Sequence, residues 1–172
     1  MKSFIRKAIL ANINYLQKLA EFFSGKEIRI QDYKLLRKDV YVSEAGFSAA
    51  FQRMQSEPRS KQQYSEEIQR LVVLSHILSS NISAVFSTLL AKNETVQNAE
   101  YEIMVIHARS ILETGIQKLG LAYHASEHVA PDKTAKPLTA IDQEEDHLIR
   151  QQLAFIMQLA RDSEKIVGEI VG

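Results

Sequence analysis

The stretch from Leu71 to Ala91, LVVLSHILSSNISAVFSTLLA, contains no charged residue and constrains the fold more than any other segment. A membrane-spanning helix needs about 20 mostly apolar residues, so the length suits a span. The serines, the threonine, the asparagine and the histidine favour a different interpretation, a helix packed on several sides inside a bundle. We expect a buried bundle helix and keep the membrane span as the alternative.

The periodicity of this stretch supports the bundle interpretation. Serines recur at every fourth position, which makes a ridge of small polar side chains along one face of a helix. Larger apolar residues recur at spacings of three and four along a different face. Small side chains let neighbouring helices approach closely, so both faces suit packing. The serine face is Ser75, Ser79, Ser83 and Ser87, and the apolar face is Leu71, Leu74, Leu78, Ile82, Val85 and Leu89.

Composition narrows the class of protein. The 21 basic and 21 acidic residues cancel, whereas a nucleic-acid-binding surface is expected to be basic. The chain has no cysteine, which excludes disulfides, thiol chemistry and thiolate metal sites. Only 6 glycines and 3 prolines occur in 172 residues, so we expect few turns and long elements.

Helical periodicity predicts five helices and no sustained strand. The fold class that we expect is all-α, an elongated antiparallel bundle of four to five long helices forming one domain over residues 1–172. Gly25 is the expected C-terminal cap of the first helix, Asp32 the N-cap of the second, and Ser60 with Gln63 a capping box for the third. The expected helices cover residues 3–24, 32–56, 60–92, 95–123 and 141–171, with a loop at 124–140.

Two short patterns resemble metal-binding motifs. His124 and His128 flank Glu127 in an H-x-x-E-H pattern, but this pattern falls at a predicted helix end close to Pro131. Glu144 and His147 form half of a carboxylate di-iron motif, and no second Glu-x-x-His is available on another helix. We therefore predict no metal, and we assign the acidic start of the last helix to favourable interaction with the helix dipole.

The remaining polar residues within predicted helices indicate structure rather than chemistry. His76 and His107 lie in apolar helices, where a histidine is more often a core or boundary residue than a ligand. Arg109 and Glu113, spaced i,i+4, are expected to form an ordinary helix-surface pair. No glycine-rich phosphate loop and no nucleophile motif occurs in the chain. We predict no catalytic residue, no cofactor and no enzymatic activity.

One further pattern covers the second predicted helix and its end. YKLLR begins the helix at Tyr33, SEAGFSAAFQRM continues it from Ser43, and an acid–proline pair ends it. This arrangement resembles the soluble segment of the fusaric-acid-resistance-like (FUSC) inner-membrane proteins, in the YccS/YhfK branch. The resemblance extends over about residues 4–90. The matching positions are Tyr33, Arg37, Arg53, Glu57 and Pro58, and we expect them to be structural.

The resemblance implies a location and partners. The chain would be a cytoplasmic helical domain at the inner face of a bacterial inner membrane. Its partners would be the transmembrane part of the same protein and further copies of itself, with no nucleic acid. Family members include exporters of aromatic carboxylic acids, but transport would reside in the membrane part. A free-standing adaptor and a small-molecule- or metal-binding bundle remain the alternatives.

The acid–proline corner also carries a local prediction. A residue before proline is driven out of the α region, so the helix must end before Pro58. We expect residues 57–60 to form a tight hairpin into the next helix, and Arg53 to pair with Glu57 across one helical turn.

Overall fold

The structure, a computed structural model, describes residues 1–91, 96–120 and 143–172, and its regular elements in these ranges are helices. The all-α bundle predicted from the sequence is confirmed. The elements are α1 (Lys2–Phe23), α2 (Ile30–Gln55), the short 3₁₀ helix η1 (Arg59–Lys61), α3 (Ser65–Leu90), α4 (Ala99–Lys118) and α5 (Gln143–Val171).

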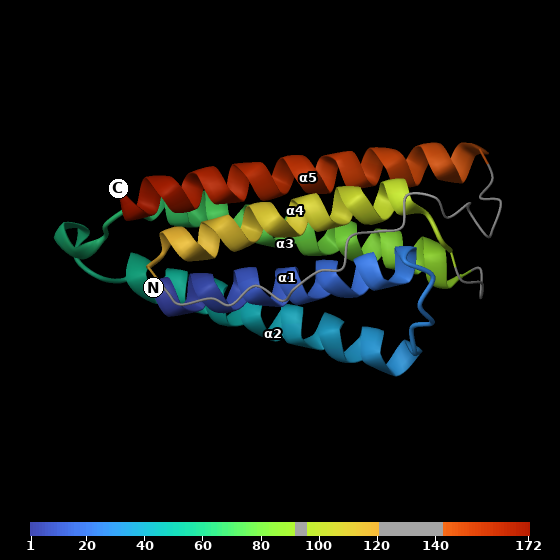
Figure 1. Cartoon of the computed structure of the whole chain (residues 1–172). Coiled ribbons are helices and arrows are strands. Elements are labelled where there is room, and N and C mark those ends of the chain that lie inside the picture. Colours follow the sequence, from blue (N-terminus) through green and yellow to red (C-terminus); the bar gives the residue numbers. More distant parts are fainter. Residues whose placement is uncertain (92–95, 121–142) are drawn as a thin grey trace.

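Four of the helices form a four-sided bundle, and the fifth lies outside it (Figure 1). α1 packs against α3 and α4, and α5 packs against the same two helices from the other side. α2 lies against α1 and α3 and has no substantial contact with α4 or α5. α2 is therefore the outer helix of the domain.

Cross-helix contacts fix the direction of each pair. α1 runs antiparallel to α2, whereas α1 and α3 run parallel, and α4 and α5 also run parallel (Figure 1). The antiparallel arrangement expected for neighbouring helices therefore does not extend to these two pairs. Because α4 and α5 run parallel, the chain between them has to cover the length of α4, which is ~30 Å for 20 residues. Residues 119–142 separate the two helices, and a chain of that many residues can span this distance. The contacts that show these directions are Tyr15–Tyr33 and Arg53–Phe4 for α1 with α2. They are Asn12–Ser75 and Tyr15–Ser83 for α1 with α3, and Tyr101–Asp146 and Lys118–Glu164 for α4 with α5.

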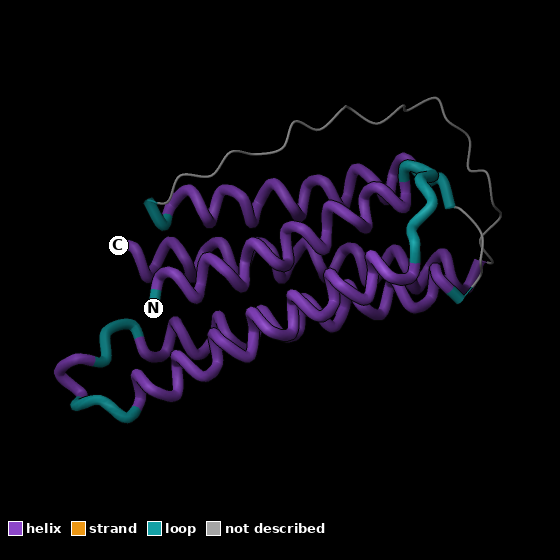
Figure 2. Tube along the Cα trace, turned by 90° about the horizontal axis from the view of Figure 1, so that it is seen from below, coloured by secondary structure: helices purple, strands orange, loops and turns teal. Residues whose placement is uncertain are grey.

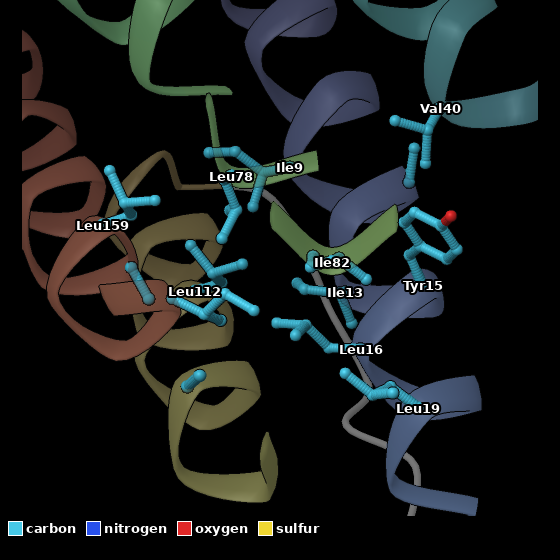
Figure 3. Packing of buried hydrophobic residues seen from close by; sticks show 14 of the residues in the cluster. Ile9, Ile13, Tyr15, Leu16, Leu19, Val40, Leu78, Ile82, Leu112 and Leu159 are labelled. Atoms are coloured by element: carbon cyan, nitrogen blue, oxygen red, sulfur yellow. The ribbon is translucent and has the colours of Figure 1, made fainter. Parts of the chain in front are cut away.

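The hydrophobic core lies between the four bundle helices and extends to the inner face of α2 (Figure 3). α1 contributes most to it, because this helix contacts three neighbours and is buried along most of its length. The labelled side chains in Figure 3 come from α1, α2, α3, α4 and α5, and Leu16 and Ile82 among them are fully buried.

α3 combines a buried face with an exposed one. The predicted apolar face is buried at Leu71, Leu78 and Ile82, while Val73 and Ile77 on the opposite side are 51% and 37% exposed. Within the described residues α3 is the one helix whose length and mean hydropathy of 1.5 would allow it to cross a membrane, and 39% of that apolar window is buried in the bundle. One such helix is weak evidence for a span, because core helices of soluble bundles have the same properties.

The ends of the helices correct several local predictions. Gly25 follows α1 with φ +84°, and its N–H bonds to the Phe22 carbonyl while Lys26 N–H bonds to Glu21, which is a Schellman motif as expected. Asp32 is not the N-cap of α2. The helix begins at Ile30 after Arg29, and Asp32 lies in the first turn, where it pairs with the Arg29 guanidinium at 3.0 Å.

The capping box predicted at Ser60 and Gln63 is also wrong. Ser60 lies in η1, and α3 begins five residues later at Ser65, after Tyr64 in a left-handed conformation. The Gln62 amide explains the difference, because it donates to the carbonyls of Gln55 and Glu57. This side chain satisfies acceptors at the end of α2 and holds the chain in a 3₁₀ turn before α3 can start.

Candidate functional site

The residues that carry the family resemblance on α2 and at its end, here called the α2 motif, do not form one site. They are Tyr33, Arg37, Arg53, Glu57 and Pro58. Tyr33 lies near the start of α2 and is buried, with its ring 5.1 Å from that of Phe86 and 6.2 Å from that of Tyr15. Arg53 lies 20 residues further along the helix, which corresponds to about 30 Å. The motif therefore marks both ends of the outer helix.

Arg37 lies on the exposed surface of α2 and contacts Tyr41 one turn further along. Its Nε and Nη2 donate to the Tyr41 hydroxyl at 3.2 and 3.1 Å, and its guanidinium lies 5.3 Å from the centre of the same ring. Both side chains are exposed, so this pair of residues is a local contact along one helix.

At the other end, α2 ends at Gln55 before Pro58, as predicted. The predicted tight hairpin is wrong, since residues 56–64 including η1 connect the two helices. The predicted pairing of Arg53 with Glu57 is also wrong. The Arg53 guanidinium lies 5.8 Å from the centre of the Phe4 ring, and no ion pair joins it to Glu57 in the described chain. Because α2 ends at Gln55, Glu57 no longer lies one helical turn from Arg53, and the guanidinium contacts the Phe4 ring on α1 instead.

A polar cluster that sequence reasoning missed joins α1, α2 and α3. Glu44 is buried to 1% exposure in the middle of α2, and its Oε1 accepts a bond from Ser75 Oγ at 3.2 Å. Asn12 Nδ2 donates to Ser75 Oγ at 3.3 Å. His76 Nδ1 lies 3.0 Å from Glu44 Oε2, and His76 Nε2 lies 3.1 Å from Ser48 Oγ.

The order of Ser48, His76 and Glu44 is that of a nucleophile, a base and an orienting carboxylate. Two features argue against hydrolysis. Glu44 Oε2 lacks an aligned hydrogen-bond donor despite its short distance to His76, so the imidazole is not held as a triad base would be. Ser48 and His76 also lie inside α2 and α3, whose backbone N–H groups are used within the helices, so none is free to stabilise an oxyanion. The cluster acts as a polar tie between helices.

A sequence signal for this cluster existed. Glu44 lies three or four residues from Val40 and Phe47, on the same helical face as these buried side chains. A carboxylate in the apolar stripe of an amphipathic helix is unusual and indicates a buried partner. The sequence left His76 open as a core or a boundary residue, and its 48% side-chain exposure makes it a boundary residue.

The Arg109–Glu113 pair is buried, which corrects the prediction of an ordinary surface pair. Arg109 is 4% exposed, and its Nε donates to Glu113 at 2.7 Å. Its Nη1 donates to the side-chain amide oxygen Oε1 of Gln17 on α1. The guanidinium therefore links α4 to α1 in a region from which water is largely excluded.

A second buried polar contact joins the starts of α4 and α5. The Tyr101 hydroxyl donates to the Asp146 carboxylate, and Arg150 lies 5.5 Å from the centre of the Tyr101 ring. Burial, followed by the bond to Asp146, raises the pKa of Tyr101 well above its usual value. The phenol therefore stays protonated and acts as a donor across the helix pair.

The possible metal ligands are scattered. Glu144 and His147 are exposed on the first turns of α5, and His147 bonds to Gln151. In residues 1–91, 96–120 and 143–172, no group of three or more histidine, aspartate or glutamate side chains is arranged to hold a metal. His124 and His128 lie outside the described residues, and His107 is exposed on α4.

A pocket of about 450 Å³ opens at the end of the bundle where α2 passes into α3. Ile5, Ala50 and Ile68 form its buried floor. The basic side chains of Arg53 and Lys61 line it together with Glu57. Two of the α2 motif residues, Arg53 and Glu57, therefore belong to a concave surface rather than to an ion pair.

The fold and these sites define a class, an all-α five-helix bundle with polar contacts between its helices and a pocket at the end where α2 passes into α3. Comparison with protein-family models, with curated proteins and with solved structures gave no significant match.

Proposed function

We propose that this chain is a non-enzymatic cytoplasmic helical domain of a bacterial inner-membrane protein of FUSC type, and that it works by helix packing and self-association. The α2 motif supports this proposal, because Tyr33 packs into the core and the helix ends before Pro58. Its partners would be the transmembrane part of the same protein and a second copy of the domain. The proposed location is the cytoplasmic face of the inner membrane.

The observation that carries the packing role is the outward face of α3. This face contains Val73, Ile77 and Ser80, all exposed, and the whole stretch from Leu71 to Ala91 carries no charge. Solvated helix faces usually carry charged residues, so an uncharged exposed face indicates contact with another apolar surface.

The outer helix α2 also carries exposed apolar side chains. Leu35 and Val42 are spaced by seven residues and therefore lie on one side of α2. They are 60% and 63% exposed and point away from the buried stripe that contains Tyr33 and Val40. Both helices thus present apolar side chains on the side away from the bundle.

Self-association is tested by charge insertion on α3. Ile77→Lys should shift the domain toward monomer in sedimentation equilibrium, because a lysine would have to be desolvated in the contact. Ile103→Lys is the matched control, since Ile103 is 41% exposed on α4. A purely monomeric parent protein, or equal effects of both variants, would contradict the proposed association through α3.

Membership in a membrane protein is tested separately. The reading frame that encodes this chain should also encode flanking hydrophobic spans. If the α2–α3 corner contacts those spans, Glu57→Gln and Pro58→Ala should reduce transport by the full-length protein while the isolated domain stays folded. A frame without spans would remove the transport-related role and favour a free-standing adaptor. The pocket lined by Arg53 favours the small-molecule-binding alternative.

A further inference from the structure

The end pocket lies where several elements meet. The start of α1, the last turns of α2, η1, the start of α3 and Ile170 of α5 all line it. The α2–α3 connection projects beyond the neighbouring ends of α1 and α5, where the two termini lie (Figures 1 and 2). The volume of the pocket, about 450 Å³, falls within the range of small-molecule sites.

The floor of this pocket is apolar. Ile5, Ala50 and Ile68 are buried, and Phe4 and Met54 are half-buried beside them. Phe4 provides a flat aromatic face, and Met54 provides an adaptable thioether surface. A ligand body that contacts this floor must be apolar and would gain most by stacking on a ring.

The rim is basic. Lys2, Arg53 and Lys61 line the pocket, and Glu57 is the one carboxylate in the lining. In the part of the chain that the structure describes, no carboxylate forms an ion pair with any of these three cations. Arg53 has its guanidinium over the Phe4 ring, which places a planar bidentate donor at the edge of the apolar floor.

These observations select the ligand by its chemistry. We propose that the pocket binds a small organic anion with an apolar, ring-containing body, the anionic group at Arg53 and the body against Phe4 and Met54. An uncharged apolar molecule would leave the basic rim unused, and a small inorganic anion would leave the apolar floor exposed. The proposal does not depend on membership in a membrane protein.

Two fluorescent probes test this proposal directly. 8-Anilinonaphthalene-1-sulfonate and N-phenyl-1-naphthylamine share one aromatic body and differ in the sulfonate. The full chain should bind one sulfonate probe per molecule, and more tightly than it binds the neutral probe. Arg53→Gln should weaken the sulfonate probe about tenfold, the effect of losing one charge-assisted hydrogen bond, and leave the neutral probe nearly unchanged.

Arg59→Gln is the matched control, because Arg59 is exposed in the same connection but does not line the pocket. Arg53→Lys keeps the charge and should restore part of the affinity. A cooperative melting transition together with an unchanged near-ultraviolet circular dichroism signal for each variant excludes binding of the probe to a partly unfolded state.

Competition identifies the shape of the ligand body. Displacement of the bound sulfonate probe by 1-naphthoate supports a compact ring, and displacement by decanoate alone contradicts the ring-containing body. The proposal is overturned if neither acid displaces the probe. It is also overturned if Arg53→Gln and Arg59→Gln weaken the probe equally in folded protein.

Discussion

His76 Nδ1 lies 3.0 Å from Glu44 Oε2, so a half-exposed imidazole on α3 contacts a carboxylate on α2 that is 1% exposed. This contact shows how the outer helix is held. Apolar contacts alone would leave the angle of α2 adjustable, whereas Glu44 must keep Ser75 and His76 within reach to remain buried. The polar cluster thus fixes the position of α2 against α1 and α3.

Removing the donor inside this cluster should destabilise the fold. Ser75→Ala leaves Glu44 Oε1 buried without its hydroxyl donor, which costs about 1–3 kcal/mol. Urea denaturation measures the change in unfolding free energy. Ser80→Ala is the control on the exposed side of the same helix and should change stability by less than about 0.5 kcal/mol. Equal effects would mean that Ser75 is not a required partner of Glu44.

Truncating the apolar face of α3 should also be costly. Leu78 and Ile82 are 2% and 0% exposed, so Leu78→Ala or Ile82→Ala should destabilise the bundle by about 2–5 kcal/mol. The exposed Val73→Ala is the comparison and should change stability by less than about 0.5 kcal/mol. A loss below about 1 kcal/mol for both core variants would show that this face is covered by something other than the bundle.

The buried phenol of Tyr101 predicts a dependence on alkaline pH. Its pKa is raised in the folded state, so its contribution to stability is complete below the unfolded pKa of about 10 and is lost as the pH rises above that value. Tyr101→Phe should cost about 1–3 kcal/mol at neutral pH, because the bond to Asp146 is lost. The variant should also lose less stability than the parent protein above pH 10. Tyrosinate absorbance should show Tyr101 titrating above the usual range of a tyrosine.

The buried carboxyl group of Glu102 is expected to destabilise the fold at neutral pH, where it has to ionise. Glu102 is 8% exposed, and burial raises the pKa of its carboxyl group above the usual value. A raised pKa means that the protonated form is favoured in the folded state, so the stability it contributes at low pH is lost as the pH rises through the folded pKa. Glu102→Gln should therefore raise the melting temperature at pH 7, and the gain should shrink at acidic pH. Glu100→Gln, on the exposed side of the same turn, should give no such gain.

The corner at Pro58 should matter little to the isolated domain. Glu57 is exposed and has no partner for its carboxylate in the described chain, so Glu57→Gln should leave the unfolding free energy nearly unchanged. Pro58→Ala should cost about 0.4–1 kcal/mol, because the unfolded chain gains conformational freedom. A chemical denaturation series on both variants measures this. A loss above about 3 kcal/mol for Glu57→Gln would show that its carboxylate is an essential contact.

Periodicity along the chain determined the helical bundle and most of its core. The serine and leucine faces of α3 are visible as spacings of three and four, and the structure buries most of the apolar face, including Leu78. On the serine face it buries Ser75 and Ser79 and leaves Ser87 exposed. Gly25 also ends α1 as expected, because a glycine readily adopts the left-handed conformation that a helix end requires. These features depend on local backbone geometry and on the burial of one helix face.

Tertiary structure alone decided how the helices pair. The parallel arrangement of α4 and α5, the burial of Arg109 against Gln17 and the stacking of Arg53 on Phe4 all join residues that are distant in sequence. Spacing within one helix correctly paired Arg109 with Glu113 but placed the pair at the surface. It also suggested Glu57 as the partner of Arg53, which lies over the Phe4 ring instead. A charged side chain takes the partner that best compensates its desolvation, and that partner is set by which helices are adjacent. The pocket beside Arg53 follows from the same adjacency, since five separate segments meet there.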